Sequence, residues 1–563
     1  MPWPKLNVQA TLFAFVFAVV AFFVLYPMVL LIAFSFQAGV PGEAFHFTWA
    51  GWHAALDESG MLESVFNTGR LLIAIQGIAL PVSIVIAWLI ARTDMPGRNW
   101  LEFMFWIAFF LPALSITLGW ILCLDPQYGV FNKLALMLPF VHESPFNIYS
   151  FWGVVWAHLG TNAIAIKVML LAPAFRNMDA ALEEAARVCG ANRFRTLLRI
   201  VVPTMTPAIL TIVLMVMIRS MQGLEIELVL GPPFDFYVYS TKIYGLISQE
   251  PPQFAPASAL ATIGLLAILP LVLVQRWIIS RRQYTTLTGK VQIQPARLGR
   301  GRYPAFALIC AVVVLLTLIP LGFLFTATFM KLFGFFDIAQ PWTFHNWIAV
   351  ITDDLFIRSL VNTLLMSGGA GILAVILYPL IAYYTVRSAF RGRSVLDFLS
   401  WIPFAIPGVL LGVGLLYVFL GNPVLKPLYG TMWVLILATV ASHMTLGTQI
   451  IKSNMIQLGV ELEEAGRVAG ATWLGTYRRI VVPIIVPVLL VVSVMVFVTA
   501  ARDIASVALL ATNETRTLAL LQLDYMVDGR YECAAVVSVV VIALSTGVAL
   551  IVRALGLRLG IRA

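Results

Sequence analysis

Residue types that perform covalent chemistry or hydrolyse ATP occur in this sequence, but not in the spacing that such chemistry needs. The only Gly-Lys pair, Gly289-Lys290, is followed by Val291, so the GxxxxGK[ST] loop that binds nucleotide phosphates is absent. The apolar stretches contain no HExxH motif and no paired carboxylates. The four cysteines form no CxxC pair and lack metal-ligand spacing: Cys123, Cys189, Cys310 and Cys533. We therefore expect a chain that is not an enzyme, forms no disulfide, and binds no metal or cofactor itself.

The composition indicates a membrane protein with many spans. The 563 residues are 61% hydrophobic and 11% charged, whereas soluble domains are about 45–50% apolar and about 25% charged. A helix of about 20 residues crosses a bilayer. Apolar stretches of about that length lie near residues 11–36, 70–91, 102–124, 150–175, 200–221, 257–280, 304–330, 359–386, 396–420, 430–451, 480–500 and 533–556. We predict an all-α polytopic protein with about twelve transmembrane helices in a lipid bilayer, the first of them a retained helix because it is too long for a signal-peptide core.

The positive charge predicts the orientation of the chain. The net charge is +9, and membrane proteins concentrate Lys and Arg in cytoplasmic loops, so we expect no nucleic-acid partner. Lys and Arg gather in alternate loops, near residues 92–98, 176–199, 281–302, 387–393, 452–479 and 553–562. All of these loops lie on one side if both termini are cytoplasmic, which we predict.

The two halves of the chain repeat each other. Asn67-Thr68 recurs as Asn362-Thr363, and Gly97-Arg98, Trp106 and Pro112 recur at the same offset of 295. Residues 181–203 align with 461–483 at an offset of 280, with 14 of 23 positions identical. The change in offset places an insertion near residues 125–149.

Six helices in each copy give the copies the same orientation, as in a parallel repeat. We predict a first repeat at 1–280, a cytoplasmic connector at 281–303 and a second repeat at 304–563.

The most similar stretch is a pair of short cytoplasmic helices, at about 179–191 and 459–471. Leu182, Ala185, Ala186 and Cys189 share one helical face, which Leu462, Ala465, Gly466 and Ala469 repeat. A face of small side chains suits a helix that docks in a groove of another protein; the alternative is a helix that lies on the protein's own loops. We also expect Asp179 to cap the first helix, Gly190 and Gly470 to permit a turn at the C-terminal ends, and Glu183 and Glu463 to pair with Arg187 and Arg467.

These residues resemble the signature of the permease subunits of binding-protein-dependent ABC importers, namely Glu-Ala-Ala, three residues, Gly, nine residues, Ile, any residue, an aliphatic and Pro. The signature falls on Glu184, Ala185, Ala186, Gly190, Ile200, Val202 and Pro203, and again on Glu464, Ala465, Gly466, Gly470, Ile480, Val482 and Pro483. Two departures occur: valine replaces the usual leucine before each proline, and Gly466 replaces the second alanine.

The resemblance implies the fold of a type I ABC importer permease in the bacterial plasma (inner) membrane. It also implies that each motif forms a coupling helix seated on a separate ABC ATPase subunit, so that two copies of the ATPase bind this chain and ATP stays on them. A periplasmic or extracytoplasmic solute-binding protein is the third partner. The fused two-copy form, with the stretches 220–244 and 501–520, resembles the ferric-iron permeases, so ferric iron is the expected cargo. Thiamine, 2-aminoethylphosphonate and polyamine are alternatives.

Several charged residues are candidates for the substrate path. Glu225 and Glu227 follow the fifth apolar segment, and Arg502-Asp503 follow the eleventh, at the external ends. Carboxylates suit a hard cation such as Fe(III), but a solvated face for the glutamates and an interfacial ion pair for Arg502-Asp503 explain them as well. Lys167, His158 and His443 lie within apolar segments. We expect the lysine to reach the cytoplasmic edge or face the bundle interior, and the histidines to be hydrogen-bonded and buried.

An ion-coupled secondary transporter is the alternative class, because some such families also have parallel six-helix repeats. It requires several ionisable residues deep in the membrane, and this sequence has few. It also leaves the duplicated motif helices unexplained.

Overall fold

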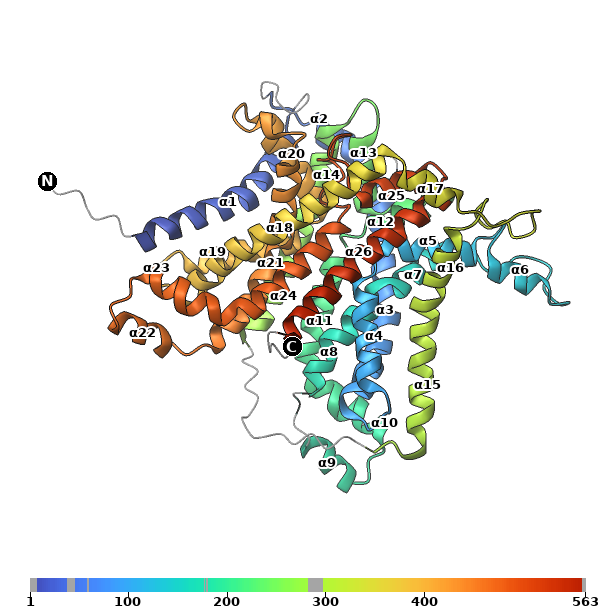
Figure 1. Cartoon of the computed structure of the whole chain (residues 1–563), viewed down its shortest axis with the longest axis horizontal. Coiled ribbons are helices and arrows are strands. Elements are labelled where there is room, and N and C mark those ends of the chain that lie inside the picture. The colour runs from blue at the N-terminus through green and yellow to red at the C-terminus, as the bar shows by residue number, and fades with distance from the viewer. Residues whose placement is uncertain are drawn as a thin grey trace.

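The computed structural model describes residues 8–37, 46–57, 60–176, 178, 181–281 and 297–558, and over these residues it is built from helices (Figure 1). Two isolated β-bridges, Gln37–Phe47 and Met330–Trp342, are the extended pairings in this part of the chain. The predicted connector 281–303 lies largely outside the described residues.

The first half contains the helices α1 (Val8–Phe34), α2 (Ala50–Asp57), α3 (Met61–Arg92), α4 (Arg98–Phe110), α5 (Ala113–Leu124), α6 (Val130–Leu136), α7 (Phe151–His158), η1 (Leu159–Ala163), α8 (Ala165–Arg176), α9 (Ala181–Val188), α10 (Arg193–Thr196), η2 (Leu197–Val201), α11 (Val202–Ser220), α12 (Glu225–Leu230), η3 (Pro232–Phe234), α13 (Tyr239–Ser248) and α14 (Phe254–Arg281). The second half contains η4 (Gly299–Gly301), α15 (Arg302–Val313), η5 (Val314–Leu318), α16 (Ile319–Ala327), α17 (His345–Ile351), α18 (Asp354–Arg387), α19 (Arg393–Ala405), α20 (Gly408–Gly421), η6 (Lys426–Leu428), α21 (Met432–Gln457), α22 (Glu461–Val468), α23 (Trp473–Thr476), η7 (Tyr477–Val481), α24 (Val482–Ala501), α25 (Leu518–Val527) and α26 (Tyr531–Arg558).

The helices confirm the all-α polytopic fold. Among the described residues, eight helices are long and apolar enough to cross a membrane, and three bent helix pairs raise this number to eleven. The remaining expected segment, 257–280, lies in α14, whose part Phe254–Pro270 is a shorter apolar helix.

Two of the expected spans are sharply broken. The chain turns by 97° between α4 and α5 and by 113° between α19 and α20. Pro112 and Pro407 stand at these breaks. Proline has no N–H to continue a helix, and it pushes the preceding residue toward extended backbone. Leu111 and Ile406 accordingly have ψ angles of 136° and 122°.

The repeat is visible in the helix boundaries. Helix α4 maps onto α19 residue for residue at the offset of 295, and α9 maps onto α22 at the offset of 280. The insertion expected near residues 125–149 contains α6, where the second half has only the turn of η6.

The two halves exchange their first helices. Helix α1 packs against α20 of the second half, and α16 packs against α5 of the first half (Figure 1). Glycine permits both crossings: a Cβ atom on Gly119 would lie 2.1 Å from the Pro320 carbonyl oxygen, and one on Gly414 would lie 2.9 Å from the Pro27 carbonyl oxygen. Gly414 is the repeat equivalent of Gly119, so both halves use the same device to hold each other.

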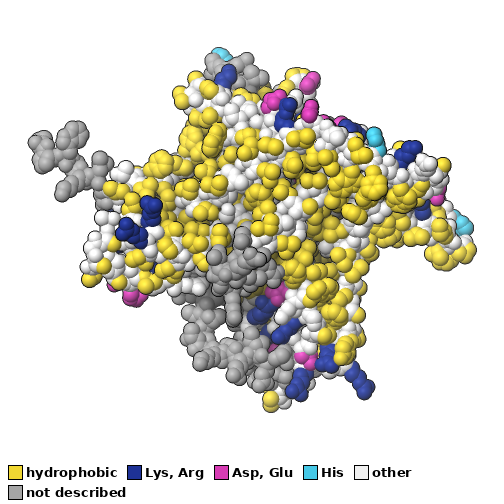
Figure 2. Space-filling model, viewed as in Figure 1, with side chains coloured by type: hydrophobic (Ala, Val, Ile, Leu, Met, Phe, Trp, Pro, Cys, Tyr) yellow, Lys and Arg dark blue, Asp and Glu magenta, His cyan; other side chains and the backbone are white. Residues whose placement is uncertain are grey.

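The outer surface is apolar over a broad area (Figure 2). Leu62, Ile73 and Ile372 are exposed on α3 and α18. An apolar surface of this extent would not remain bare in water, but it matches a bilayer interior.

We expect Gly119→Leu to lower the free energy of unfolding by about 1–3 kcal/mol, because the added side chain meets fixed backbone at the α5–α16 crossing. Thermal unfolding of the detergent-solubilised protein, followed by size-exclusion chromatography, measures the loss. Gly322→Leu is the matched control, because Gly322 of α16 has no described atom within 4 Å of its Cβ position. Equal stability of the two variants would contradict the close crossing.

Candidate functional site: the motif helices and the crossing between the halves

The two motif helices project from the molecule at the lower left (α22) and at the bottom (α9) of Figure 1, and the part of the molecule that carries them is called here the motif side. Both end at a glycine in the left-handed region, Gly190 with φ 78° and Gly470 with φ 82°. The N–H of Ala191 donates to the Ala186 carbonyl at 3.0 Å, and Ala471 repeats this bond to Gly466. This six-residue bond closes a Schellman turn. The turn expected at these glycines is therefore present in both copies.

The buried face of each motif helix differs from the expected small-residue face. Glu183 and Ala186 are buried on α9, and Glu463 and Gly466 are buried on α22. A Cβ atom on Gly466 would lie 2.7 Å from the Ile480 Cδ1 atom. The second small residue of the motif therefore packs against the protein's own chain, and the expectation that all four small positions share one outward face was wrong.

The outward face carries the other small residues and one larger apolar residue. Ala185, Cys189, Ala465 and Ala469 are exposed. Val188 is 88% exposed and its equivalent Val468 is 90% exposed. Sequence reasoning missed these valines, although they lie three residues beyond the exposed alanines in both copies, which places them on the same side of the helix.

A buried ion pair anchors each motif helix to the preceding part of its own half. The Arg92 Nε atom, at the end of α3, lies 3.2 Å from a Glu183 carboxylate oxygen, and the Arg387 Nε atom, at the end of α18, lies 3.3 Å from a Glu463 oxygen. The hydroxyl of Tyr383 donates to the other Glu463 oxygen at 2.8 Å.

In the second half, these contacts replace the expected pair of Glu463 with Arg467. The expected pair of Glu183 with Arg187 stays a prediction, because the Arg187 side chain lies outside the described residues. The glutamates lie on the inward face of their helices, and their partners come from α3 and α18. Asp179, the expected cap, and the side chain of Glu184 lie outside the described residues; Glu464 is exposed.

The ends of the two motifs form wide helical turns. The π-helices η2 and η7 contain Ile200 and Ile480, and Pro203 and Pro483 occupy the first turn of the α-helices that follow. A proline ring collides with the carbonyl one turn back, and a π turn opens that position. The motif proline thus sets the entry into α11 and α24.

The two halves are bonded to each other at the proline breaks. Gln222 donates to the Phe404 carbonyl at 2.9 Å. Its repeat equivalent, Arg502, donates to the carbonyls of Phe109 and Leu111 at 2.9 and 3.0 Å. Phe109 and Phe404 are also repeat equivalents. Each half therefore supplies the hydrogen-bond donor for the break in the other half.

Charged side chains surround the region where Gln222 and Arg502 bond to the proline breaks, which is called here the crossing between the halves. Asp503 interacts electrostatically with Arg219, Arg502 and His443, and it accepts hydrogen bonds from the backbone and hydroxyl of Ser506. Arg219 is exposed although it lies over the Phe404 ring, 5.9 Å from its centroid. The predicted path residues Glu225, Arg502 and Asp503 are thus close together. Arg502 donates hydrogen bonds to the carbonyls of Phe109 and Leu111, whereas the sequence offered an ion pair with Asp503 as one explanation of this residue.

The two glutamates of α12 have different environments. Burial, reinforced by the negative charge of Asp503, raises the pKa of Glu225 to about 7. Glu227 is buried, and a carboxylate oxygen lies 2.9 Å from the His158 Nε2 atom. The alternative of a solvated face is therefore wrong for Glu227. The hydrogen-bonded environment expected for His158 is present, and His443 contacts Ser442 and the Thr439 carbonyl.

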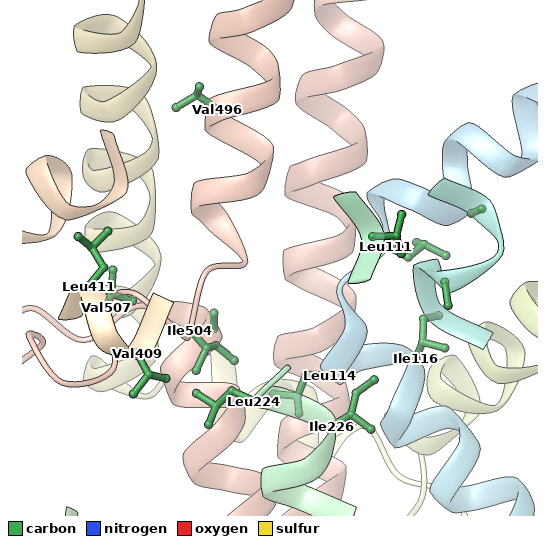
Figure 3. Packing of buried hydrophobic residues seen from close by; sticks show 14 of the residues in the cluster. Leu111, Leu114, Ile116, Leu224, Ile226, Val409, Leu411, Val496, Ile504 and Val507 are labelled. Atoms are coloured by element: carbon green, nitrogen blue, oxygen red, sulfur yellow. The ribbon is translucent and has the colours of Figure 1, made fainter. Parts of the chain in front are cut away.

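Apolar residues fill the space beside these charges. Leu224 and its equivalent Ile504 lie between the broken helix pairs of the two halves (Figure 3). Leu114 and Val409, also repeat equivalents, flank them, and all four are buried. The crossing is filled by buried side chains contributed in pairs by both halves.

Two further features limit the chemistry of the interior. Lys167 is buried in α8 and donates to the Ala163 carbonyl at 2.8 Å, so it faces the bundle interior. Within the described residues, no three His, Cys, Asp or Glu side chains are grouped to hold a metal ion.

Comparison with known proteins agrees with this architecture. The family model for the binding-protein-dependent transport system inner membrane component matches residues 79–284 and 370–561. The fold and the motif helices together define the class of protein: a polytopic permease with two copies of this domain. The chain belongs to this family of inner membrane components of binding-protein-dependent transport systems, and its apolar helices make it a multi-pass membrane protein.

Three relatives illustrate the similarity. The ferric transport system permease protein FbpB of Actinobacillus pleuropneumoniae is 30% identical over 395 residues, which are 69% of this chain and 56% of the relative. The putative ferric transport system permease protein FbpB 1 of Haemophilus influenzae is 30% identical over 378 residues, or 66% and 58%. The probable ABC transporter permease protein y4fN of Sinorhizobium fredii is 26% identical over 481 residues, or 82% of each chain. The chain spans a little over half the length of the first two relatives.

We expect Arg502→Leu to lower the free energy of unfolding by about 1–3 kcal/mol, because it leaves the carbonyls at the first break without a donor. Arg502→Gln is the matched variant, since Gln222 already makes the equivalent bond in the other half. It should lose less stability. Thermal unfolding in detergent compares them, and a leucine variant as stable as the glutamine variant would contradict the bond.

Proposed function

We propose that this permease couples two ABC ATPase subunits, one on α9 and one on α22, to movement of the crossing between its halves. The observation that carries the proposal is the exposed apolar face, with Val188 and Val468, on two motif helices of identical length. A single exposed valine needs no explanation by itself, but the same exposed valine stands beside exposed alanines on both repeat helices. A helix face of this kind fits a groove in another protein.

We further propose that the motif side is cytoplasmic and that both termini lie there. Support comes from basic residues beside the motif helices, among them Arg92 and Arg387, because membrane proteins concentrate Lys and Arg in cytoplasmic loops. The N-terminal part of α1 is also close to the motif side: the hydroxyl of Tyr384, near the end of α18, donates to the Gln9 carbonyl at 3.1 Å. A solute-binding protein then delivers cargo to the opposite side.

The passage for the cargo runs between the halves at the proline breaks. Gln222 and Arg502 close it from opposite halves, and the buried pair Leu224 and Ile504 fills it. Relative rotation of the halves, driven by closure of the two ATPase subunits, separates these contacts and opens the path. Glu225, Arg502 and Asp503 are the charged residues that cargo meets there.

Ferric iron is the cargo we propose. The support is the 30% identity to two ferric permeases and the carboxylates of Glu225 and Asp503, which suit a hard cation. More distant relatives are named as molybdate/tungstate and maltose permeases, so the family itself does not decide the cargo. Thiamine, 2-aminoethylphosphonate and polyamine are the competing cargoes, and an ion-coupled carrier is the competing class.

We expect Val468→Asp to reduce the amount of ATPase that copurifies with the chain at least tenfold, because it places a charge in the proposed apolar contact. Uptake should fall in parallel. The matched control is Val424→Asp, since Val424 is 82% exposed and lies in the loop after α20, away from the motif helices. Unchanged copurification in the Val468 variant would contradict the coupling role.

The motif residues should show the same dependence. Gly470→Leu forces a φ of 82° on a residue with a side chain, at a cost of about 1–2 kcal/mol, and should misdirect the end of α22. Gly190→Leu and Glu184→Lys should act likewise in the first half. Because both ATPase subunits work together, a change in one motif alone should abolish uptake; full uptake would mean that one half is dispensable.

The cargo is tested by uptake of radioactive Fe(III) in cells that carry the permease with its ATPase and binding protein. We expect accumulation that is lost in the Val468→Asp variant and is not reduced by excess thiamine or 2-aminoethylphosphonate. Saturable uptake of one of those compounds, without uptake of iron, would assign a different cargo and leave the coupling proposal intact.

A further inference from the structure

Helices α3 and α18 are bonded at both ends to segments that the proposed transport cycle must move. Each is one uninterrupted α-helix, Met61–Arg92 in the first half and Asp354–Arg387 in the second. Their bonds to other segments are repeated in both halves.

At the motif side, the last residue of each helix is the arginine of a buried ion pair. Arg92 bonds to Glu183 of α9 and donates to the Met178 carbonyl at 3.0 Å. Arg387 bonds to Glu463 of α22 and donates to the Leu458 carbonyl, which is the repeat equivalent of Met178. One guanidinium therefore fixes both the motif helix and the chain that leads into it.

At the opposite end, an Asn-Thr pair binds the segment that follows the crossing. Asn67 donates to the Tyr237 carbonyl at 3.2 Å, and the Thr68 hydroxyl accepts the N–H of Tyr239 at 2.9 Å. These contacts hold the start of α13, which follows Gln222 and Glu225 in the chain.

The second half repeats this arrangement. Asn362 donates to the carbonyls of Glu514 and Arg516 at 2.8 and 3.0 Å, and the Thr363 hydroxyl accepts the N–H of Leu518 at 2.8 Å. These contacts hold the start of α25, which follows Arg502. The Asn-Thr repeat in the sequence thus has a structural role.

The two sets of bonds lie about 36 Å apart along each helix, by the rise of 1.5 Å per residue. A helix held at both ends by buried, directional contacts transmits a displacement of one end to the other. The ion pair is well suited to this, because a buried charge that loses its partner is strongly unfavourable, so the helix end must follow the motif helix.

We propose that Arg92 and Arg387 are positioning residues that transmit movement of the motif helices, through α3 and α18, to the segments that close the crossing. The inference rests on the proposed coupling of α9 and α22 to ATPase subunits. It deepens that proposal by naming the route: ion pair, long helix, Asn-Thr pair, and then α13 or α25.

The test uses the full complex of permease and ATPase in proteoliposomes with loaded binding protein. Arg387→Gln should keep the ATPase copurifying at the wild-type level and keep its basal hydrolysis. Transport, and the stimulation of hydrolysis by loaded binding protein, should fall at least tenfold. Arg98→Gln is the control, because Arg98 is exposed at the start of α4, a few residues beyond Arg92, and should leave all four readouts unchanged.

Thr363→Val provides the second variant, at the opposite end of α18 and without change of side-chain shape. It should produce the same separation of hydrolysis from transport although it lies far from the ATPase. The proposal is overturned if Thr363→Val transports at the wild-type level with full stimulation, or if Arg387→Gln simply loses the ATPase. A wild-type chain that retains no ATPase would instead refute the proposed coupling itself.

Discussion

The structure depends on the need of every buried backbone carbonyl for a hydrogen-bond donor. A bilayer interior supplies no water for this purpose, and the prolines that break the third span of each half leave carbonyls outside the helical pattern. Gln222 and Arg502 provide the donors, each from the opposite half. The hydrogen bonds at the breaks therefore exist only while the halves are together, which is why we propose the opening at this junction.

The same reciprocity extends from the crossing to the periphery. The first helix of each half packs on the other half through Gly119 and Gly414, so the two repeats cannot separate as independent bodies. The proposed cycle therefore uses rotation of one half against the other. The buried pairs of Arg92 with Glu183 and of Arg387 with Glu463 hold each motif helix on its own half.

Local patterns in the sequence predicted much of this arrangement. The repeat offsets predicted matching helices, and the motif glycines predicted turns that the structure contains. What could not be predicted depends on long-range contacts. Glu183 lies 91 residues from Arg92, and Arg502 lies 393 residues from Phe109. From the sequence alone, the nearest positive charge, Arg187, is the expected partner of Glu183. The breaks at Pro112 and Pro407 were missed because membrane helices often contain proline without breaking.

The energy source is the most direct test of the account. The permease, its ATPase and its binding protein are reconstituted into vesicles, and accumulation of cargo is measured with ATP on the motif side and no ion gradient. The account predicts accumulation under these conditions, and none when ATP is replaced by a proton or sodium gradient. Accumulation by the permease alone, driven by such a gradient without any ATPase present, would contradict it.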